Sequence, residues 1–360
     1  MKGQDFLRAM FVLSMVVLVG VFALSNAAYA ASGDTIKLKL SNWLPETGTE
    51  GKMGKWWGTE LEKRSQGLVK IDYYFAEALV KTMDSLPAVS SGIADVQFVA
   101  EGYFPSHLPL LGGLHLLYQT ESGWVMGECQ AEMSDTFQPF QKMMQKNNII
   151  PAIYVPASEV VIASVKPIRK LEDLKGKKVR AMGLMNTAMK MLGATPVAMP
   201  LPEVYEALER GTLDVVTGIP YHLVVAFKLH EVAKYIVGPH MGCYATGAYY
   251  MHQDTWSKLP DQIKKIVEDL KAEHLGVYVE MTNELHQKTT EALRAGKCDI
   301  YSLPQDEVKR WKDKLVPEIY NEWTAQMEKK GLPGKEVLEV YQELIKKYEP
   351  MDKYDSPFEK

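Results

Sequence analysis

The sequence predicts an α/β fold of two similar lobes with a helical C-terminal third, on three observations. The chain has 360 residues, of which 46% are hydrophobic and 24% charged. It is therefore long enough for two domains, too apolar for a disordered chain and too charged for a polytopic membrane protein. A β-α-β-α-β order occurs twice, and the C-terminal third has the apolar periodicity of long helices.

The chain begins with the layout of a secretory signal peptide over residues 1–30. Lys2 and Arg8 precede an apolar run over residues 9–24, and Ala28-Tyr29-Ala30 supplies the small residues of a cleavage site. We therefore expect export with cleavage after Ala30. The alternative is an uncleaved anchor, for which the run is short, since a membrane span takes about 20 residues.

The first β-α-β-α-β unit follows the predicted signal peptide. Its strands are expected at residues 35–40, 68–71 and 95–99. The first of its helices carries Met53, Trp56, Trp57 and Leu61 and ends at Gly67, and the second covers residues 82–91 and ends at Gly92. The last strand is apolar throughout, as expected of a strand buried in a sheet.

The same order returns in a second unit. Its strands are expected at residues 177–180, 197–199 and 214–217, and its helices at 186–192 and 201–210, ending at Gly193 and Gly211. Residues 86–96 and 205–215 share the pattern apolar-x-Ala-apolar-x-x-Gly-x-x-Asp-Val. One glycine-stopped helix before a strand is common in α/β proteins, but its recurrence inside a repeated order favours two related lobes. Two exported lobes suggest a hinged ligand-binding protein with its site in the cleft between them.

The C-terminal third is predicted to be helical. A helix from Asp261 to about Arg294 would be about 50 Å long and could lie across both lobes, or it could break at Gly276. Further helices are expected at residues 306–330 and 335–347. We expect the polar segment after Tyr348 to be loosely ordered.

Charge and cysteine content exclude some classes of protein. The net charge is −4, which argues against a nucleic-acid partner. The signal peptide holds Lys2, Arg8 and Asp5, a net +1, so its removal changes the charge of the chain from −4 to −5. Three cysteines are too few for a disulfide scaffold, although two of them could pair; they are Cys129, Cys243 and Cys298.

Catalytic, cofactor and metal motifs are absent from the sequence. It holds no G-x-S-x-G, H-E-x-x-H or P-loop pattern and no G-x-G-x-x-G after the first strand. His222 and His230 would lie two turns apart on a helix, too far for one metal ion. We therefore expect no cofactor and no metal, and a binding protein rather than an enzyme. An exported enzyme with scattered catalytic groups acting on an organic acid is the alternative.

Arg180 is the strongest candidate for ligand binding. It ends a predicted interior strand, and buried strands rarely carry arginine unless it is paired. At the carboxyl end of such a strand its guanidinium could hold a carboxylate through two hydrogen bonds. The alternatives are a structural acid as its partner or an edge strand that faces water.

Other candidates also lie at strand ends. Trp43, Tyr103 and Tyr221 each follow a predicted strand and could form the walls of a binding pocket. Glu159 precedes an apolar strand and could bind a ligand amine or hydroxyl, or pair with Arg180. Thr217, at the end of the 214–217 strand, could supply a polar contact.

Several runs in this order resemble the periplasmic solute-binding proteins of TRAP transporters, of the C4-dicarboxylate-binding type. The resemblance covers nearly all of residues 35–350. The runs that carry it are residues 41–43 (SNW), 91–96 (SGIADV), 102–105 (GYFP), 166–180 (KPIRKLEDLKGKKVR), 192–197 (LGATPV), 203–208 (EVYEAL) and 227–235 (FKLHEVAKY).

The resemblance implies a periplasmic-binding-protein-like fold, with each lobe a mixed sheet flanked by helices and a long helix spanning both lobes. The implied divisions are residues 34–157 plus 245–285 for lobe I, 158–244 plus 286–350 for lobe II, and 351–360 as a tail. It implies periplasmic capture of a small organic anion and delivery to TRAP permease membrane subunits. It also assigns the carboxylate-binding arginine of the family to Arg180.

Two departures from the family pattern bear on the ligand. A second arginine of several members falls near Val160, and an asparagine of some members is absent from residues 214–220. These departures favour a monocarboxylate, including an aromatic one, or a sulfonate over a simple dicarboxylate or sialic acid. A ligand-sensing lobe for a membrane receptor remains an alternative to transport.

Overall fold

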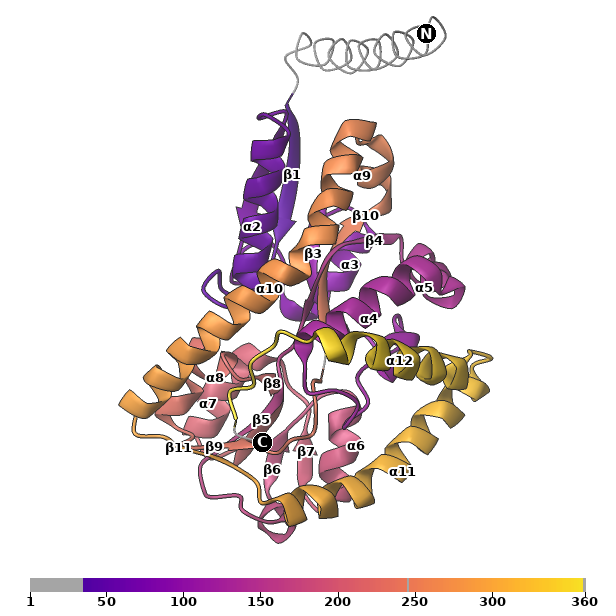
Figure 1. Ribbon diagram of the computed structural model, residues 1–360. Coiled ribbons are helices and arrows are strands. Elements are labelled where there is room, and N and C mark those ends of the chain that lie inside the picture. The colour runs from indigo at the N-terminus through magenta and orange to yellow at the C-terminus, as the bar shows by residue number, and fades with distance from the viewer. Residues whose placement is uncertain (1–34, 245, 359–360) are drawn as a thin grey trace, which may run out of the picture.

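The computed structural model describes residues 35–244 and 246–358. The predicted signal peptide, residues 1–30, lies outside the described residues. Two β-sheets form the cores of two lobes, one above the other in Figure 1, and helices flank both. The predicted fold class of two mixed sheets flanked by helices is confirmed.

The first sheet has five strands in the order β2-β1-β3-β10-β4. Its strands are β1 (Ile36–Ser41), β2 (Val69–Tyr74), β3 (Val96–Ala100), β4 (Ile149–Pro156) and β10 (Thr246–His252). Helices in this part of the chain are α2 (Thr49–Arg64), α3 (Ser85–Ser90), α4 (Gly123–Thr136), α5 (Gln138–Lys146) and α9 (Gln253–Lys258).

The second sheet has six strands in the order β11-β9-β5-β8-β6-β7. Its strands are β5 (Val160–Ser164), β6 (Lys178–Arg180), β7 (Thr195–Val197), β8 (Val215–Pro220), β9 (Tyr235–Gly238) and β11 (Asp299–Ser302). Its short helices are α6 (Leu184–Met191), α7 (Val204–Glu209) and α8 (Leu223–Ala226).

The predicted β-α-β-α-β repeat is present in both sheets. Strand β1 pairs in parallel with β2 and β3, and β6 pairs in parallel with β7 and β8. The next strand in each sheet is antiparallel, β10 beside β3 and β5 beside β8. These two antiparallel strands directly follow the segments where the chain crosses between lobes.

The crossing segments lie against one another. The chain leaves the first sheet after β4 and returns to it before β10, and an isolated antiparallel bridge joins Glu159 to Cys243 between these segments. The backbone N–H of Val160 also donates to the carbonyl of Gly242, at 3.1 Å. The two crossings therefore form one junction between the lobes.

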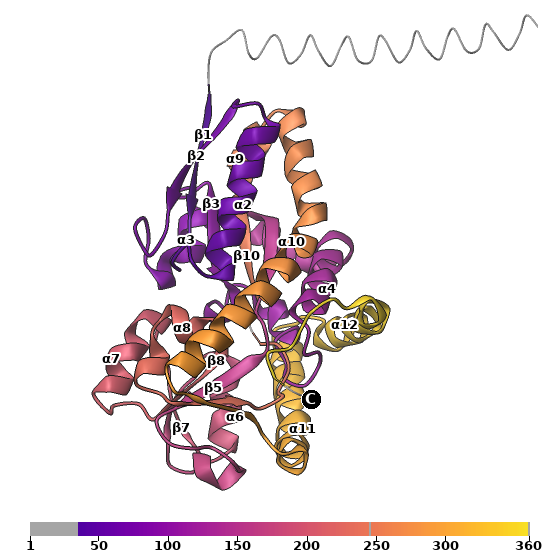
Figure 2. The ribbon, with the colours of Figure 1, turned by 60° about the vertical axis from the view of Figure 1, so that its left-hand side comes forward.

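Helix α10 (Asp261–Ala295) is a third connection between the two lobes, and it is continuous over 35 residues. It runs from beside the first sheet down to the second lobe in both views of the ribbon (Figures 1 and 2). Of the two possibilities left open by the sequence, the unbroken helix is therefore the one observed. A Cβ placed on Gly276 would meet nothing within 4 Å, so this glycine lies on the open side of the helix.

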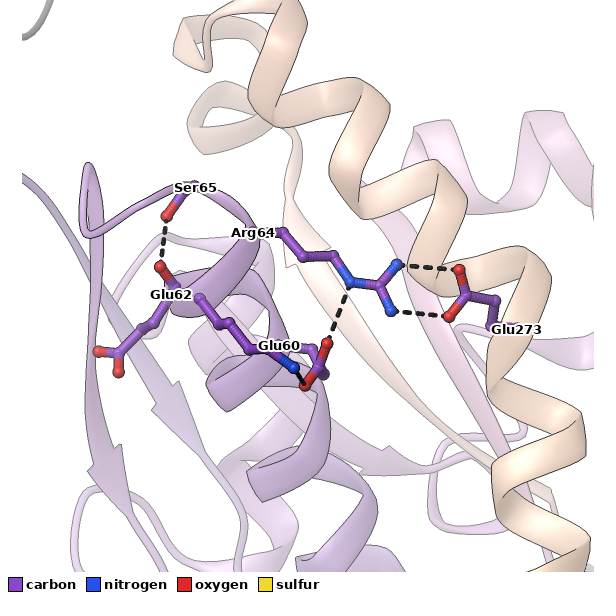
Figure 3. Close-up of polar contacts among 6 residues, drawn as sticks. Glu60, Glu62, Arg64, Ser65 and Glu273 are labelled. Carbon is purple, nitrogen blue, oxygen red and sulfur yellow. Dashed lines mark hydrogen bonds and ion pairs between the residues drawn. The ribbon is translucent and has the colours of Figure 1, made fainter.

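An ion pair at the surface, between Arg64 and Glu273, joins α2 to α10. Arg64 donates from both terminal nitrogens to the two carboxylate oxygens of Glu273, at 2.9 and 2.8 Å, and from Nε to Glu60 (Figure 3). The side chains of Arg64 and Glu273 are 31% and 50% exposed, so water screens their attraction. We expect this fork to fix the relative position of the helices more than it stabilises the fold.

The last helices are α11 (Gln305–Lys329) and α12 (Gly334–Tyr348). Helix α12 packs against α4 and α11, and its assignment to the second lobe stays a prediction. The segment after α12 is not loose as expected, because Phe358 is buried against Gly238. The backbone N–H of Asp355 also donates to the side-chain oxygen of Asn283, and its carbonyl lies 3.2 Å from Nδ1 of His286, both residues of α10. The remaining lobe boundaries stay a prediction.

Two further features bear on the class of protein. Cys129, Cys243 and Cys298 are free thiols, so the possible disulfide is not formed. Over residues 35–244 and 246–358, the helices are all too short or too polar to cross a membrane.

Candidate functional site between the lobes

A cavity lies between the two sheets and takes its walls from both lobes. It encloses about 590 Å³ not filled by atoms, part of it open to solvent. The residues that line it are Trp43, Leu44, Glu50, Phe98, Ala100, Gly102, Tyr103, Val155, Ala157, Arg180, Met182, Leu201, Gly218, Ile219, Pro220, Leu223, Tyr244 and Gly247. Most of these are apolar, and Arg180 and Glu50 are the charged side chains among the described residues that line it.

Arg180 is buried at the end of β6, with 2% of its surface exposed. Its Nε donates to the carbonyl of Met199 at 3.1 Å, and Nη1 points to the carbonyl of Thr217 at 3.4 Å. Nη2 donates to the hydroxyl of Tyr103 at 2.8 Å, which links the second lobe to the first. A guanidinium has five N–H donors, so two remain beyond these three contacts.

Arg180 has no ion-pair partner among residues 35–244 and 246–358. A buried charge without a partner is costly, whereas an anion bound in the cavity would neutralise it. The structural acid considered from the sequence is therefore not present among the described residues.

The backbone around Arg180 opens the strand end to the cavity. Gly183, three residues further on, has φ +54°, and a Cβ there would lie 2.7 Å from the Tyr244 hydroxyl. Glycine is therefore required where the chain turns from β6 into α6. The Tyr244 hydroxyl donates to the carbonyl of Met182 at 2.6 Å and accepts from the N–H of Met185 at 3.3 Å. Burial raises the pKa of Tyr244 to about 12, so this phenol stays neutral.

Aromatic rings form the first-lobe wall of the cavity. Trp43 follows β1 and makes an edge contact with Tyr103 at 5.8 Å between ring centroids, and a tilted contact with Phe98 at 6.2 Å. The indole N–H of Trp43 is buried with no hydrogen-bond partner among the described groups. Such a wall suits a flat apolar ligand body, with the indole N–H available as a donor.

Glu50 and His222 form a buried pair that joins the lobes beside the cavity. Oε2 of Glu50, in the first turn of α2, lies 2.9 Å from Nε2 of His222, which precedes α8 in the second lobe. Burial alone would raise the pKa of the Glu50 carboxyl, but the charge and hydrogen bond of His222 outweigh it and hold that pKa below its usual range. The cavity wall therefore carries a carboxylate as well as a guanidinium.

The structure brings together three of the six predicted binding residues as cavity-lining side chains: Arg180, Trp43 and Tyr103. Thr217 contributes only its carbonyl, to Arg180, because its hydroxyl donates to the carbonyl of Val161.

The other two predicted residues lie outside the lining of this cavity. The hydroxyl of Tyr221 lies 2.9 Å from the hydroxyl of Thr290 in α10, and its ring packs against Phe358. Glu159 lies at the junction of the crossings and lines a separate polar hollow with Tyr354. For these two residues ligand contact stays a prediction that this arrangement does not support.

Sequence reasoning missed Glu50 and Tyr244. Glu50 lies in the first turn of a helix, where acidic residues are common for other reasons. Tyr244 lies on a crossing segment, where no strand or helix pattern indicates its direction. One signal was available for the glycines that line the cavity, since Gly102, Gly218 and Gly247 all come at or near strand ends.

The described residues offer no group of three or more histidine, cysteine or acidic side chains that could hold a metal ion. The cavity-lining side chains include neither a serine nor a cysteine nucleophile within that part of the chain. This arrangement is suited to binding a small ligand. The guanidinium of Arg180, several aromatic rings and tyrosine hydroxyls surround a largely apolar space.

Comparison with known proteins identifies the family. The family described as bacterial extracellular solute-binding protein, family 7, matches residues 40–326. The chain belongs to this family. It is a solute-binding protein and not an enzyme, and its relatives are periplasmic binding proteins.

Individual relatives are more distant in sequence than in fold. The C4-dicarboxylate-binding periplasmic protein DctP of Rhodobacter capsulatus is 25% identical over 83% of this chain and 90% of its own length. A TRAP solute-binding protein from Rhodoferax ferrireducens, in complex with copurified benzoate, has a TM-score of 0.81 at 23% identity, covering 88% of this chain and 99% of that one. A marine metagenome TRAP solute-binding protein specific for aromatic acid ligands, with 3-hydroxybenzoate, gives the same four values. The predicted resemblance to TRAP solute-binding proteins, which work with membrane permease subunits, is confirmed.

Proposed function

We propose that this protein captures a small organic monocarboxylate, with an aromatic acid the best fit, in the cavity between its lobes. The observation that carries the proposal is Arg180, a buried cation without a described counter-ion in an otherwise apolar cavity. A carboxylate could accept the two N–H donors that Arg180 has left. The rings of Trp43, Tyr103 and Phe98 would hold the ligand body.

Binding would favour the closed arrangement of the lobes. Arg180 belongs to the second lobe, and Tyr103 and Trp43 belong to the first. A ligand held by Arg180 would therefore contact both walls only when they approach one another, and this difference in contacts shifts the population towards closure. A TRAP permease could then recognise the closed form. The relatives that hold benzoate and 3-hydroxybenzoate support the aromatic class.

The place of action is proposed from the sequence. Residues 1–30 have the three-part pattern of a cleaved signal peptide, and we propose cleavage after Ala30. Mass spectrometry of the protein recovered from the periplasm would give an N-terminus at Ala31 if this is correct.

The ligand proposal is tested by calorimetry on ligand-stripped protein with benzoate, 3-hydroxybenzoate, succinate and benzenesulfonate. We expect an aromatic carboxylate to bind, and Arg180→Ala to weaken that binding by about 3 kcal/mol or more, because a charge-assisted bidentate contact is lost. Arg180→Lys keeps the charge but not the fork and should recover only part of the affinity.

The matched control is Arg169→Ala, which removes an arginine that is 57% exposed in its side chain and paired with Asp299 on the surface. It should leave the affinity unchanged. Failure of every carboxylate and sulfonate to bind would overturn the proposed ligand class, and full affinity in Arg180→Ala would overturn the role of Arg180.

A further inference from the structure

We propose that the Glu50 carboxylate sets the ligand specificity of this cavity, excluding ligands with a second anionic group and binding a hydroxyl on the ligand that Arg180 anchors. This inference rests on the proposed function and deepens it, because it defines which organic acids the site accepts. It depends on three features of the structure: the position of Glu50, its partner, and the charges around the cavity.

Glu50 lines the cavity from a backbone position that is itself anchored. Its carbonyl accepts a hydrogen bond from the hydroxyl of Tyr249 at 2.8 Å, a residue of the neighbouring sheet that is itself fully buried. Only 5% of Glu50 is exposed. The contact with Tyr249 fixes the backbone from which the side chain starts, and burial keeps the carboxylate away from solvent.

His222 holds the carboxylate across the cleft. The contact of 2.9 Å joins two side chains that are 4% and 7% exposed, one from each lobe. A carboxylate has about four lone-pair positions, of which this contact uses one. Glu50 can therefore keep His222 as a partner and still accept a hydrogen bond from a ligand hydroxyl.

The pair with His222 keeps Glu50 in its anionic form, since the pKa of Glu50 is lowered despite its burial. Among the described residues, the cavity lining then presents one positive group, Arg180, and one negative group, Glu50, whereas the imidazole of His222, whose charge keeps Glu50 anionic, is not part of that lining. Like charges repel strongly where water is excluded. A second carboxylate on the ligand would meet this repulsion, whereas a hydroxyl would find an acceptor.

The experiment compares matched ligands on the full-length mature protein. The probes are benzoate, the 3- and 4-hydroxybenzoates, and the corresponding dicarboxylates, isophthalate and terephthalate. We expect the wild type to bind a monocarboxylate at least about tenfold more tightly than the matched dicarboxylate, and Glu50→Gln to reduce that ratio by about tenfold. Glu50→Gln should also reduce any preference for a hydroxybenzoate over benzoate.

Two variants keep this test decisive. Glu50→Asp keeps the charge and should retain the preference for one anionic group, even if its overall affinity falls. Glu60→Gln removes a carboxylate of the same helix that pairs with Lys63 and Arg64 and does not line the cavity, so it should change neither ratio. Thermal denaturation of each variant shows whether it is folded.

The outcomes separate this inference from the proposed function. If no carboxylate binds the wild type, the proposed function fails. If monocarboxylates bind and the ratio to dicarboxylates is the same in wild type, Glu50→Gln and Glu50→Asp, the proposed function stands and the role of Glu50 is overturned.

Discussion

At the scale of single residues, the site depends on how Arg180 is held before any ligand arrives. Its three protein contacts come from two carbonyls of its own lobe and one hydroxyl of the other. Carbonyl and hydroxyl oxygens orient a guanidinium without neutralising it. The side chain is therefore fixed in direction while its charge is left for an anion.

The contact between Arg180 and Tyr103 leads to a first prediction. Tyr103→Phe removes the hydroxyl that accepts from Nη2 of Arg180 and keeps the ring that packs on Trp43. We expect ligand affinity to fall about tenfold, because a hydrogen bond to a charged group is lost. The control is Tyr301→Phe, which removes a hydroxyl bonded to the backbone of Ile168 in the second lobe and should leave affinity unchanged in calorimetry. Equal affinity for both variants would contradict this role for Tyr103.

The site residues that could be predicted from the sequence are those that follow the carboxyl end of a predicted strand. Trp43, Tyr103 and Arg180 lie at or just beyond the carboxyl ends of β1 and β3 in the first sheet and β6 in the second, and all three side chains line the cavity between the sheets. Tyr221 also follows a strand, but its side chain is directed to α10, a contact between residues far apart in the sequence.

Glu50 could not be predicted in this way, because its place in the site depends on a hydrogen bond to His222, 172 residues away in the sequence. Local patterns identify strand ends, whereas a pairing between lobes exists only after both lobes have folded.

At the scale of elements, the units with a clear local pattern were predicted within a few residues. Helix α2, the long helix α10 and the three strands of each repeat lie where the apolar spacing placed them. The neighbours of these strands could not be predicted, because β5 and β10 reach their positions through the crossings. The order of the C-terminal segment was not predicted either, because it depends on packing of Phe358 against Gly238 of β9, a contact between residues far apart in the sequence.

The continuity of α10 leads to a prediction about Gly276. Glycine in a helix interior costs about 1 kcal/mol relative to alanine, and the added Cβ would meet nothing within 4 Å. Gly276→Ala should therefore raise the free energy of unfolding by about 1 kcal/mol in urea denaturation. Gly58→Ala in α2 is the opposite case, because its Cβ would lie 2.4 Å from the Tyr73 hydroxyl, and it should destabilise. A destabilised Gly276→Ala would show that the helix needs this glycine.

At the scale of the whole molecule, α10 is attached to both lobes through buried histidines. Nε2 of His274 accepts from the backbone N–H of Tyr154 in β4, and Nδ1 contacts the carbonyl of Lys271. The ring of His286 packs against Tyr221 in the second lobe. Burial lowers the pKa of each histidine to about 4, because the charged form is poorly solvated.

These histidines predict a loss of stability in mild acid. Between pH 6.5 and about 4 the unfolded chain binds protons at both histidines and the folded chain does not. The free energy of unfolding should therefore fall as pH decreases through this window, by about 1 kcal/mol per pH unit for each histidine. Urea denaturation at pH 7, 6 and 5 measures the slope, and His274→Gln should reduce it. The same slope in wild type and variant would exclude His274 as the cause.

The strand order has a consequence for folding. Taken in chain order, β1 to β5 and β6 to β10 are two five-strand units, yet each unit gives its fifth strand to the other sheet. In the first sheet, β10 fills the gap between β3 and β4, and β5 fills the matching gap between β8 and β9. Each five-strand unit therefore gives four strands to one sheet and one strand to the other. Neither half of the chain can complete a sheet alone, so we expect that a lobe expressed by itself would not fold as a separate domain.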